Sequence, residues 1–130
     1  MSKHWKQWKD LCQITEIIEI RIRKSKSQLI HLRRKLQVQN QEKQALLHRI
    51  SELEKEKMCL DLQVEKKALS KLFMRRDSIN SKIDLISFDL LIVMSSISEL
   101  SSEIENTEAE LSSFEKRKEL LDELKKELIK

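Results

Sequence analysis

The chain contains no glycine, no proline and no tyrosine among its 130 residues. Glycine supplies the positive φ angles of tight turns and proline supplies breaks, so strands, hairpin turns and phosphate-binding loops lack the residues that they need. Aromatic residues make up only 4% of the chain, which disfavours an enclosed ligand pocket at this length. We therefore expect an all-α protein that has no catalytic residues and is not an enzyme.

Charged residues make up 37% of the chain, a share that is also typical of disordered proteins. However, 39% of the residues are hydrophobic, which is more than a fully solvated chain carries. The 26 basic residues are nearly balanced by 22 acidic ones, so we expect no nucleic-acid partner. The longest apolar run, Leu90 to Met94, is far too short to span a membrane, so we expect no membrane insertion. The two widely separated cysteines fit a reducing, cytoplasmic setting.

The histidines give no metal-binding pattern. His4, His31 and His48 are too far apart for any two of them to share one helix turn, as the ligands of a zinc site would. His48 and Glu52 are spaced as an ordinary pair on a helix surface. We therefore expect no metal and no cofactor.

Two hydrophobic seams run through the chain in steps that alternate between three and four residues. The first seam extends from Trp8 to Val64 and the second from Leu69 to Leu128, and most positions in both are apolar. This repeat is typical of helices that supercoil against a partner helix. The step from Val64 to Leu69 is one residue too long to continue the repeat, so the coil is interrupted there.

This interruption predicts two long helices, at about residues 5–64 and 67–129, with a turn near residues 61–68. Together they form a single antiparallel coiled-coil hairpin over residues 1–130. Two other arrangements are open. One is a continuous rod that dimerises, and the other is a turn at residues 76–80, where Asp, Ser and Asn compete with helix for backbone hydrogen bonds.

The charge distribution favours the hairpin. The basic segment, Arg21 to Lys35, contains seven basic residues and no acidic one, whereas residues 83–115, the acidic segment, contain no basic residue. In a hairpin, residue i lies opposite roughly residue 133 minus i, so these segments face each other. In a parallel dimer, each segment would instead lie against its own copy.

Two regions carry more apolar surface than a two-helix seam needs. The helix between Leu85 and Met94 is apolar around most of its circumference, which indicates a partner, self-association, or local adjustment that buries part of it. The paired termini carry Trp5 and Trp8 together with a leucine-rich end. Tryptophan is a favoured anchor of protein interfaces. The alternative for Trp8 is that it packs within the coiled coil itself. The apolar partner patch is formed by Leu85, Phe88, Leu91, Ile92 and Met94.

The chain resembles the small stalk proteins of type III secretion systems and flagella, the FliJ and YscO (SctO) family, and is most similar to the virulence-associated branch. The segment IIEIRIRKSKSQLIHLRRKL, Ile17 to Leu36, looks like the opening of that family. The segment LQVEKKALSKLFMRRDSINSKIDL, Leu62 to Leu85, looks like the start of its second helix. The resemblance covers most of the chain after residue 16.

The resemblance implies a stalk that stands in the pore of a hexameric secretion ATPase, hydrolyses nothing, and couples the ATPase to an export-gate protein. It also implies export chaperones as partners and a cytoplasmic location, peripheral to the inner membrane. On this basis the ATPase-binding end comprises Trp5, Trp8, Arg21, Arg23, Lys24, Leu121, Leu124 and Leu128. The export-gate end comprises Leu69, Leu72, Phe73 and Arg76. The alternative functions are a coiled-coil chaperone or scaffold that holds a hydrophobic partner helix, and a homodimeric tether.

Overall fold

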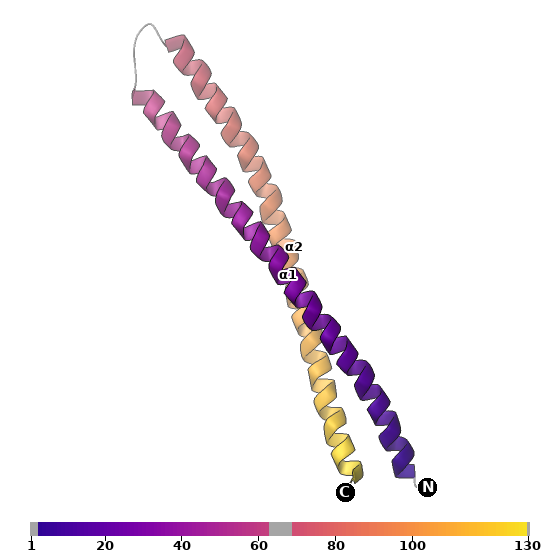
Figure 1. Cartoon of the computed structure of the whole chain (residues 1–130). Coiled ribbons are helices and arrows are strands. Elements are labelled where there is room, and N and C mark those ends of the chain that lie inside the picture. Colours follow the sequence, from indigo (N-terminus) through magenta and orange to yellow (C-terminus); the bar gives the residue numbers. More distant parts are fainter. Residues whose placement is uncertain (1–2, 63–68, 130) are drawn as a thin grey trace. The chain divides into compact units, whose positions relative to one another are not determined.

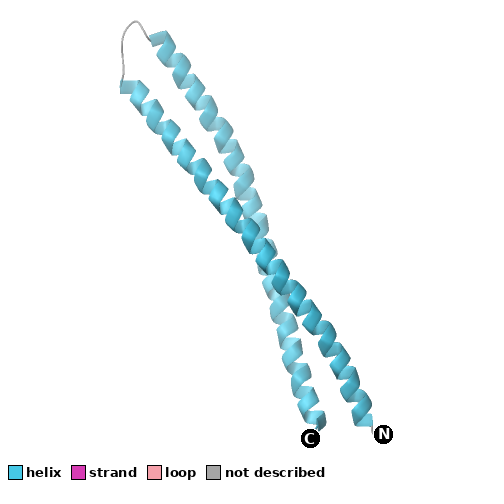
Figure 2. Ribbon diagram, viewed as in Figure 1, coloured by secondary structure: helices cyan, strands magenta, loops and turns pink. Residues whose placement is uncertain are grey.

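The computed structural model describes residues 3–62 and 69–129, which form two long α-helices (Figure 1). Helix α1 comprises Lys3–Leu62 and helix α2 comprises Leu69–Ile129. The two helices pack against each other, so the prediction of an all-α helical hairpin is confirmed (Figure 2). A long helix is what a chain of good helix formers without glycine or proline adopts when one face is apolar.

The helix boundaries differ slightly from those predicted. Helix α1 begins before residue 5, and Asp61 and Leu62, which were assigned to the turn, belong to α1. Helix α2 begins at Leu69 rather than at residue 67. The rest of the predicted turn, residues 63–68, lies outside the described residues, as does Val64 of the first seam. The alternative turn at residues 76–80 is wrong, because that stretch is helical.

The described residues group into two compact units, and each unit contains a part of both helices. Unit 1 pairs residues 3–35 of α1 with residues 100–129 of α2. Unit 2 pairs residues 36–62 of α1 with residues 69–99 of α2.

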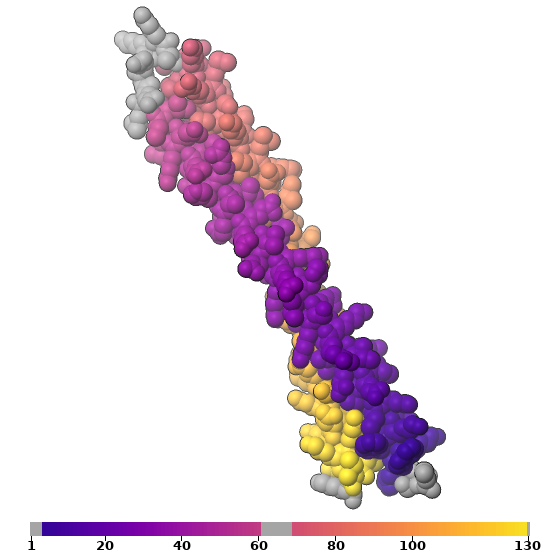
Figure 3. Space-filling model, in the orientation of Figure 1, coloured from indigo at the N-terminus to yellow at the C-terminus, as the bar shows by residue number. Residues whose placement is uncertain are grey.

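In unit 1 the two helices run antiparallel. Arg33 Nη2 lies 3.1 Å from Glu108 Oε1, and Lys118 Nζ lies 3.7 Å from Glu19 Oε1. Residues early in α1 thus meet residues late in α2. The start of α1 and the end of α2 lie at the same end of this unit, where their side chains meet (Figure 3). The basic segment belongs to unit 1, as do residues 100–115 of the acidic segment, and Arg33 and Glu108 join them.

The predicted pairing rule is offset from the observed one. It placed residues near 114 opposite Glu19 and residues near 100 opposite Arg33, whereas Lys118 and Glu108 form the ion pairs. The observed partners therefore lie about one and two helical turns further toward the C-terminus of α2.

The two seams form the interface between the helices. Every first-seam position from Leu11 to Leu60 is buried or half-buried, and so is every second-seam position from Leu72 to Leu128. Only the first described position of each seam, Trp8 and Leu69, is exposed. The alternation of three and four residues therefore identified the buried face of both helices.

Burial is unequal between the units. The buried residues of unit 1 are Thr15, Ile18, Ile22, Ser25, Leu29, Leu32, Ile104 and Thr107, and those of unit 2 are Leu53, Ile79 and Val93. The seam of unit 2 contains four long polar residues, Gln39, Lys43, Lys57 and Arg76, whereas that of unit 1 contains two, Lys118 and Lys125. Unit 2 therefore buries fewer side chains because its seam contains more long polar ones, whose ends stay in water.

Two of the three buried hydroxyl side chains of unit 1, those of Thr15 and Thr107, bond to the backbone of their own helix. Thr15 Oγ1 donates a hydrogen bond to the carbonyl oxygen of Leu11 at 2.7 Å, and Thr107 Oγ1 donates one to that of Glu103 at 2.8 Å. Each bond reaches back one turn of its own helix, so the hydroxyl group is satisfied without a partner from the other helix.

Within the described residues, no helix has the length and hydrophobicity to cross a membrane.

Candidate functional site

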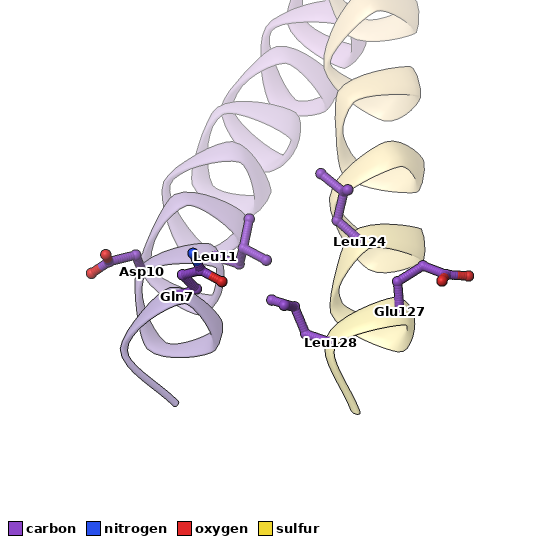
Figure 4. A pocket seen from close by; sticks show the side chains of 6 residues that line it. All are labelled: Gln7, Asp10, Leu11, Leu124, Glu127 and Leu128. Carbon is purple, nitrogen blue, oxygen red and sulfur yellow. The ribbon is translucent and has the colours of Figure 1, made fainter. Parts of the chain in front are cut away.

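An apolar groove lies between the helices at the free end of unit 1. It has a volume of about 440 Å³, is open to solvent and is lined by Gln7, Asp10, Leu11, Leu124, Glu127 and Leu128, here called the terminal groove. Leu11, Leu124 and Leu128 point toward one another across it, whereas Asp10 and Glu127 point outward on opposite sides (Figure 4). The groove therefore has an apolar floor and acidic rims.

Large exposed apolar side chains occur in the same end turns of the two helices as the terminal groove. Trp5 and Trp8 of α1 are both exposed, and so are Leu124 and Ile129 of α2. The Nζ atom of Lys9 lies 5.5 Å from the centre of the Trp5 ring, so one face of this indole contacts a cation. Exposed tryptophan on a thin helical pair is unusual because it leaves a large apolar surface in water. This end therefore presents the chemistry of a protein-binding surface.

Leu11 and Leu128 show how the sequence builds this groove. Both are seam positions and both are half-buried, and the next seam position toward the start of α1, Trp8, is exposed. Of the lining residues, Leu124 and Leu128 were predicted as site residues from the sequence, and the others were not. Leu11 could have been found, since it is the seam residue nearest to Trp8.

The basic residues assigned to the ATPase-binding end have different surroundings. The guanidinium carbon of Arg21 lies 5.8 Å from the centre of the Phe114 ring, and Arg117 lies at the same distance from that ring. Phe114 is a half-buried residue of the second seam, so Arg21 stacks over the helix interface. Arg23 and Lys24 are exposed on α1. Leu121 is half-buried in the seam.

The residues assigned to the export-gate end lie on one side of α2, because their spacing repeats every three to four residues. Leu69 and Phe73 are exposed, whereas Leu72 and Arg76 are half-buried toward the seam. A second groove of about 370 Å³ lies nearby in unit 2 and is lined by Glu56, Cys59, Leu60, Arg75, Ser78, Ile79 and Lys82. Its lining is mainly polar, whereas the terminal groove has an apolar floor of three leucines.

The apolar partner patch divides into two parts on the helix. Leu85, Phe88, Leu91 and Ile92 are all more than half exposed, with exposed fractions from 56% to 68%. Met94 is also exposed, but it lies about 180° around the helix from Leu85, about 160° from Ile92 and about 120° from Phe88, and only Leu91 is close to it. The first four residues share one face, here called the outer stripe. Met94 is not part of it.

His48 and Glu52 form the surface pair that their spacing predicted. His48 Nε2 lies 3.0 Å from Glu52 Oε1, and Arg49 Nη1 lies 3.4 Å from the other oxygen of the same carboxylate. Among the described residues, no group of three or more His, Cys, Asp or Glu side chains is arranged to hold a metal ion. Both cysteines are free thiols, with Cys12 half-buried and Cys59 exposed.

Comparison of the chain with models of protein families, with characterised proteins and with solved structures found no match.

Proposed function

We propose that this chain is the non-enzymatic central stalk of a type III secretion system. The free end of unit 1 binds a hexameric secretion ATPase, and the start of α2 contacts an export-gate protein. Export chaperones are further partners, and the site of action is the cytoplasmic side of the inner membrane, at the secretion apparatus. The resemblance of Ile17 to Leu36 and of Leu62 to Leu85 to the stalk family suggests this role.

One observation carries the proposal, namely the exposed apolar surface around the terminal groove. Trp5, Trp8 and Leu124 are exposed at the end of an antiparallel helix pair. A surface that combines exposed tryptophan, an apolar groove and a charged rim is typical of a protein interface with a few dominant anchor residues. Two helices that end together can enter a pore that admits only a narrow partner.

The test is stimulation of ATP hydrolysis by the purified chain, using the secretion ATPase of the organism from which the chain comes. We expect the hydrolysis rate to rise in proportion to the bound chain and to saturate at a fixed stoichiometry. The variant Trp5→Ser/Leu124→Ser removes two exposed apolar side chains from the free end of unit 1, one of which, Leu124, lines the terminal groove. It should weaken binding by at least about tenfold, which corresponds to about 1.4 kcal/mol.

A matched control is Val38→Ser, which removes an apolar side chain of similar exposure from unit 2. This variant should stimulate the ATPase as the natural chain does. If the natural chain binds neither the ATPase nor the export-gate protein, the stalk proposal is wrong. If both variants bind equally well, the terminal groove is not the contact.

The outer stripe favours a second candidate function, a scaffold or chaperone that holds a hydrophobic helix of another protein. Two variants separate the candidates. A scaffold would lose client binding in Phe88→Glu/Leu91→Glu, and any effect on an ATPase would be unchanged. A stalk would keep its coupling in that variant and lose it when the ends of α1 and α2 are removed. A homodimeric tether would need a surface other than the two seams, because these already pair within one chain.

A further inference from the structure

The outer stripe points away from the helix that α2 packs against. Phe88 is two residues from both Ile86 and Leu90, so it lies about 200° around the helix from each of these half-buried seam residues. Leu85, Leu91 and Ile92 flank Phe88 on the same face. Helix α1 covers the seam side of α2 in unit 2 and therefore cannot cover the outer stripe.

The spacing of the outer stripe is that of a second coiled-coil seam. Leu85, Phe88 and Ile92 are separated by steps of three and four residues, and the same steps lead back to Ser81 and on to Ser95. Serine at these two positions is small, so another helix could approach α2 closely just before and just after the apolar stretch. The face from Ser81 to Ser95 covers about four helical turns.

The charges around the outer stripe are acidic. Asp84 and Asp89 lie at its two edges, both of them exposed, and no basic residue occurs on α2 between Lys82 and Lys116. Lys82 itself lines the polar groove of unit 2, on the side toward α1. On α1, Arg49 is paired with Glu52, and Lys43 is a half-buried seam residue. These cations of α1 thus lie on the far side of α2 from the outer stripe.

This charge pattern discriminates between possible occupants. If a second copy of the chain used the same stripe, Asp84 and Asp89 of both copies would be brought together at an apolar contact, and like charges there are unfavourable. A helix with basic residues on both sides of an apolar face would instead place a cation beside each carboxylate. Charge complementarity therefore favours another protein over a second copy.

We infer that the outer stripe of α2 is a docking site for a basic amphipathic helix of a partner protein, with apolar residues spaced three and four apart and lysine or arginine on both flanks. The partner adds a third helix to the pair in unit 2. This inference deepens the scaffold candidate by naming the chemistry of its client, and it does not depend on ATPase binding.

The experiment uses the full chain and two synthetic helical peptides of about 20 residues, long enough to cover the face with a stable helix. Both peptides carry leucine at the seam spacing, and the flanking positions are lysine in one and glutamate in the other. Fluorescence anisotropy measures binding, and we expect a Kd of about 1 to 100 μM for the lysine peptide, as befits a small interface. The glutamate peptide should bind at least about tenfold more weakly.

Three variants locate the contact. Phe88→Ser/Leu91→Ser removes the centre of the outer stripe and should weaken binding of the lysine peptide at least about tenfold. Met94→Ser, about 120° around the same helix from Phe88, should change the Kd by less than about twofold. Asp84→Asn/Asp89→Asn should lower affinity and reduce its dependence on salt. Circular dichroism checks that each variant retains its helices, which we expect because these side chains are exposed.

Four results would overturn the inference. The first two are that the lysine peptide does not bind, or that both peptides bind equally well. The third is that Met94→Ser weakens binding of the lysine peptide as much as Phe88→Ser/Leu91→Ser does. The last is that the chain self-associates and Phe88→Ser/Leu91→Ser abolishes this self-association. The last result would identify a second copy as the occupant. Stimulation of the secretion ATPase by Phe88→Ser/Leu91→Ser is measured in parallel, so failure of this inference and failure of the stalk proposal give different results.

Discussion

Leu53 and Leu47 lie on the same helix in unit 2 and differ sharply in burial. Leu53 is 0% exposed, whereas Leu47 is 39% exposed. Leu53 occupies a seam position and Leu47 does not, so the seam rule alone separates them. A leucine that is fully enclosed in a two-helix coil must contact residues on both helices, because one neighbouring turn cannot surround it.

Leu53→Ala should lower the free energy of unfolding by about 2–4 kcal/mol, because it removes buried methyl groups and leaves a cavity. Leu47→Ala is the matched control and should cost less than about 1 kcal/mol, since much of its side chain is already in water. Urea denaturation followed by circular dichroism measures both. Equal losses in the two variants would show that Leu53 is not enclosed as the structure has it.

The hydroxyl groups of Thr15 and Thr107 illustrate what residue patterns do and do not predict. The seam rule placed both residues at the interface, and both are buried. It did not predict that each side chain would bond to the carbonyl one turn back, because Thr can also expose its hydroxyl group or pair across the seam. The stacking of Arg21 over Phe114 was missed for a similar reason, since it depends on the exact register of the two helices.

At the scale of the helices, the sequence determined the buried face better than the register. The face follows from local spacing, which a single helix shows by itself. The register depends on the length and path of the connection, and only the phase break between Val64 and Leu69 indicated where that lies. The exposed surface of the candidate site was likewise predictable from composition, but the separation of Met94 from the outer stripe required helix geometry.

The ion pair between Arg33 and Glu108 links the basic and acidic segments, and its two side chains are 59% and 49% exposed. We expect a coupling energy of only about 0.2–1 kcal/mol, because solvent screens exposed pairs. A double-mutant cycle with Arg33→Glu and Glu108→Arg measures it: each single variant should be less stable, and the double variant should recover most of the loss. The coupling should shrink in about 1 M salt. A cycle without any coupling would mean that charge does not align these segments.

Gln39 is a half-buried polar residue in the part of the first seam that belongs to unit 2. Gln39→Leu should raise the free energy of unfolding by about 1 kcal/mol, because it extends the apolar seam. Gln37→Leu, at an exposed position two residues earlier, should give no comparable gain. The midpoint of urea denaturation measures the difference. A larger gain from Gln37→Leu would contradict the assignment of the seam in unit 2.

At the scale of the whole molecule, the two units differ in how firmly the helices are held. Unit 1 contains most of the buried residues, whereas unit 2 combines few buried residues with several polar seam positions. The buried apolar area sets the free energy of local opening, so the helices of unit 2 should separate more often than those of unit 1.

Native-state hydrogen exchange tests this difference between the units. Amides at residues 18–32 and 100–114 should exchange more slowly than amides at residues 40–54 and 76–90, by about tenfold or more for a difference of about 1.4 kcal/mol in opening free energy. Gln39→Leu should slow exchange in unit 2 and leave unit 1 almost unchanged. Uniform exchange along both helices would show that the two units open together.

The start of α1 and the end of α2 lie side by side in unit 1, and this has a mechanical consequence. A force that pulls the two chain ends apart breaks the seam contacts one after another, beginning near Leu11 and Leu128, rather than all at once. A partner that binds both ends and holds them in contact applies no such separating force. Clamping the ends would therefore protect the helix pair from tension and let it bear torsion or compression instead.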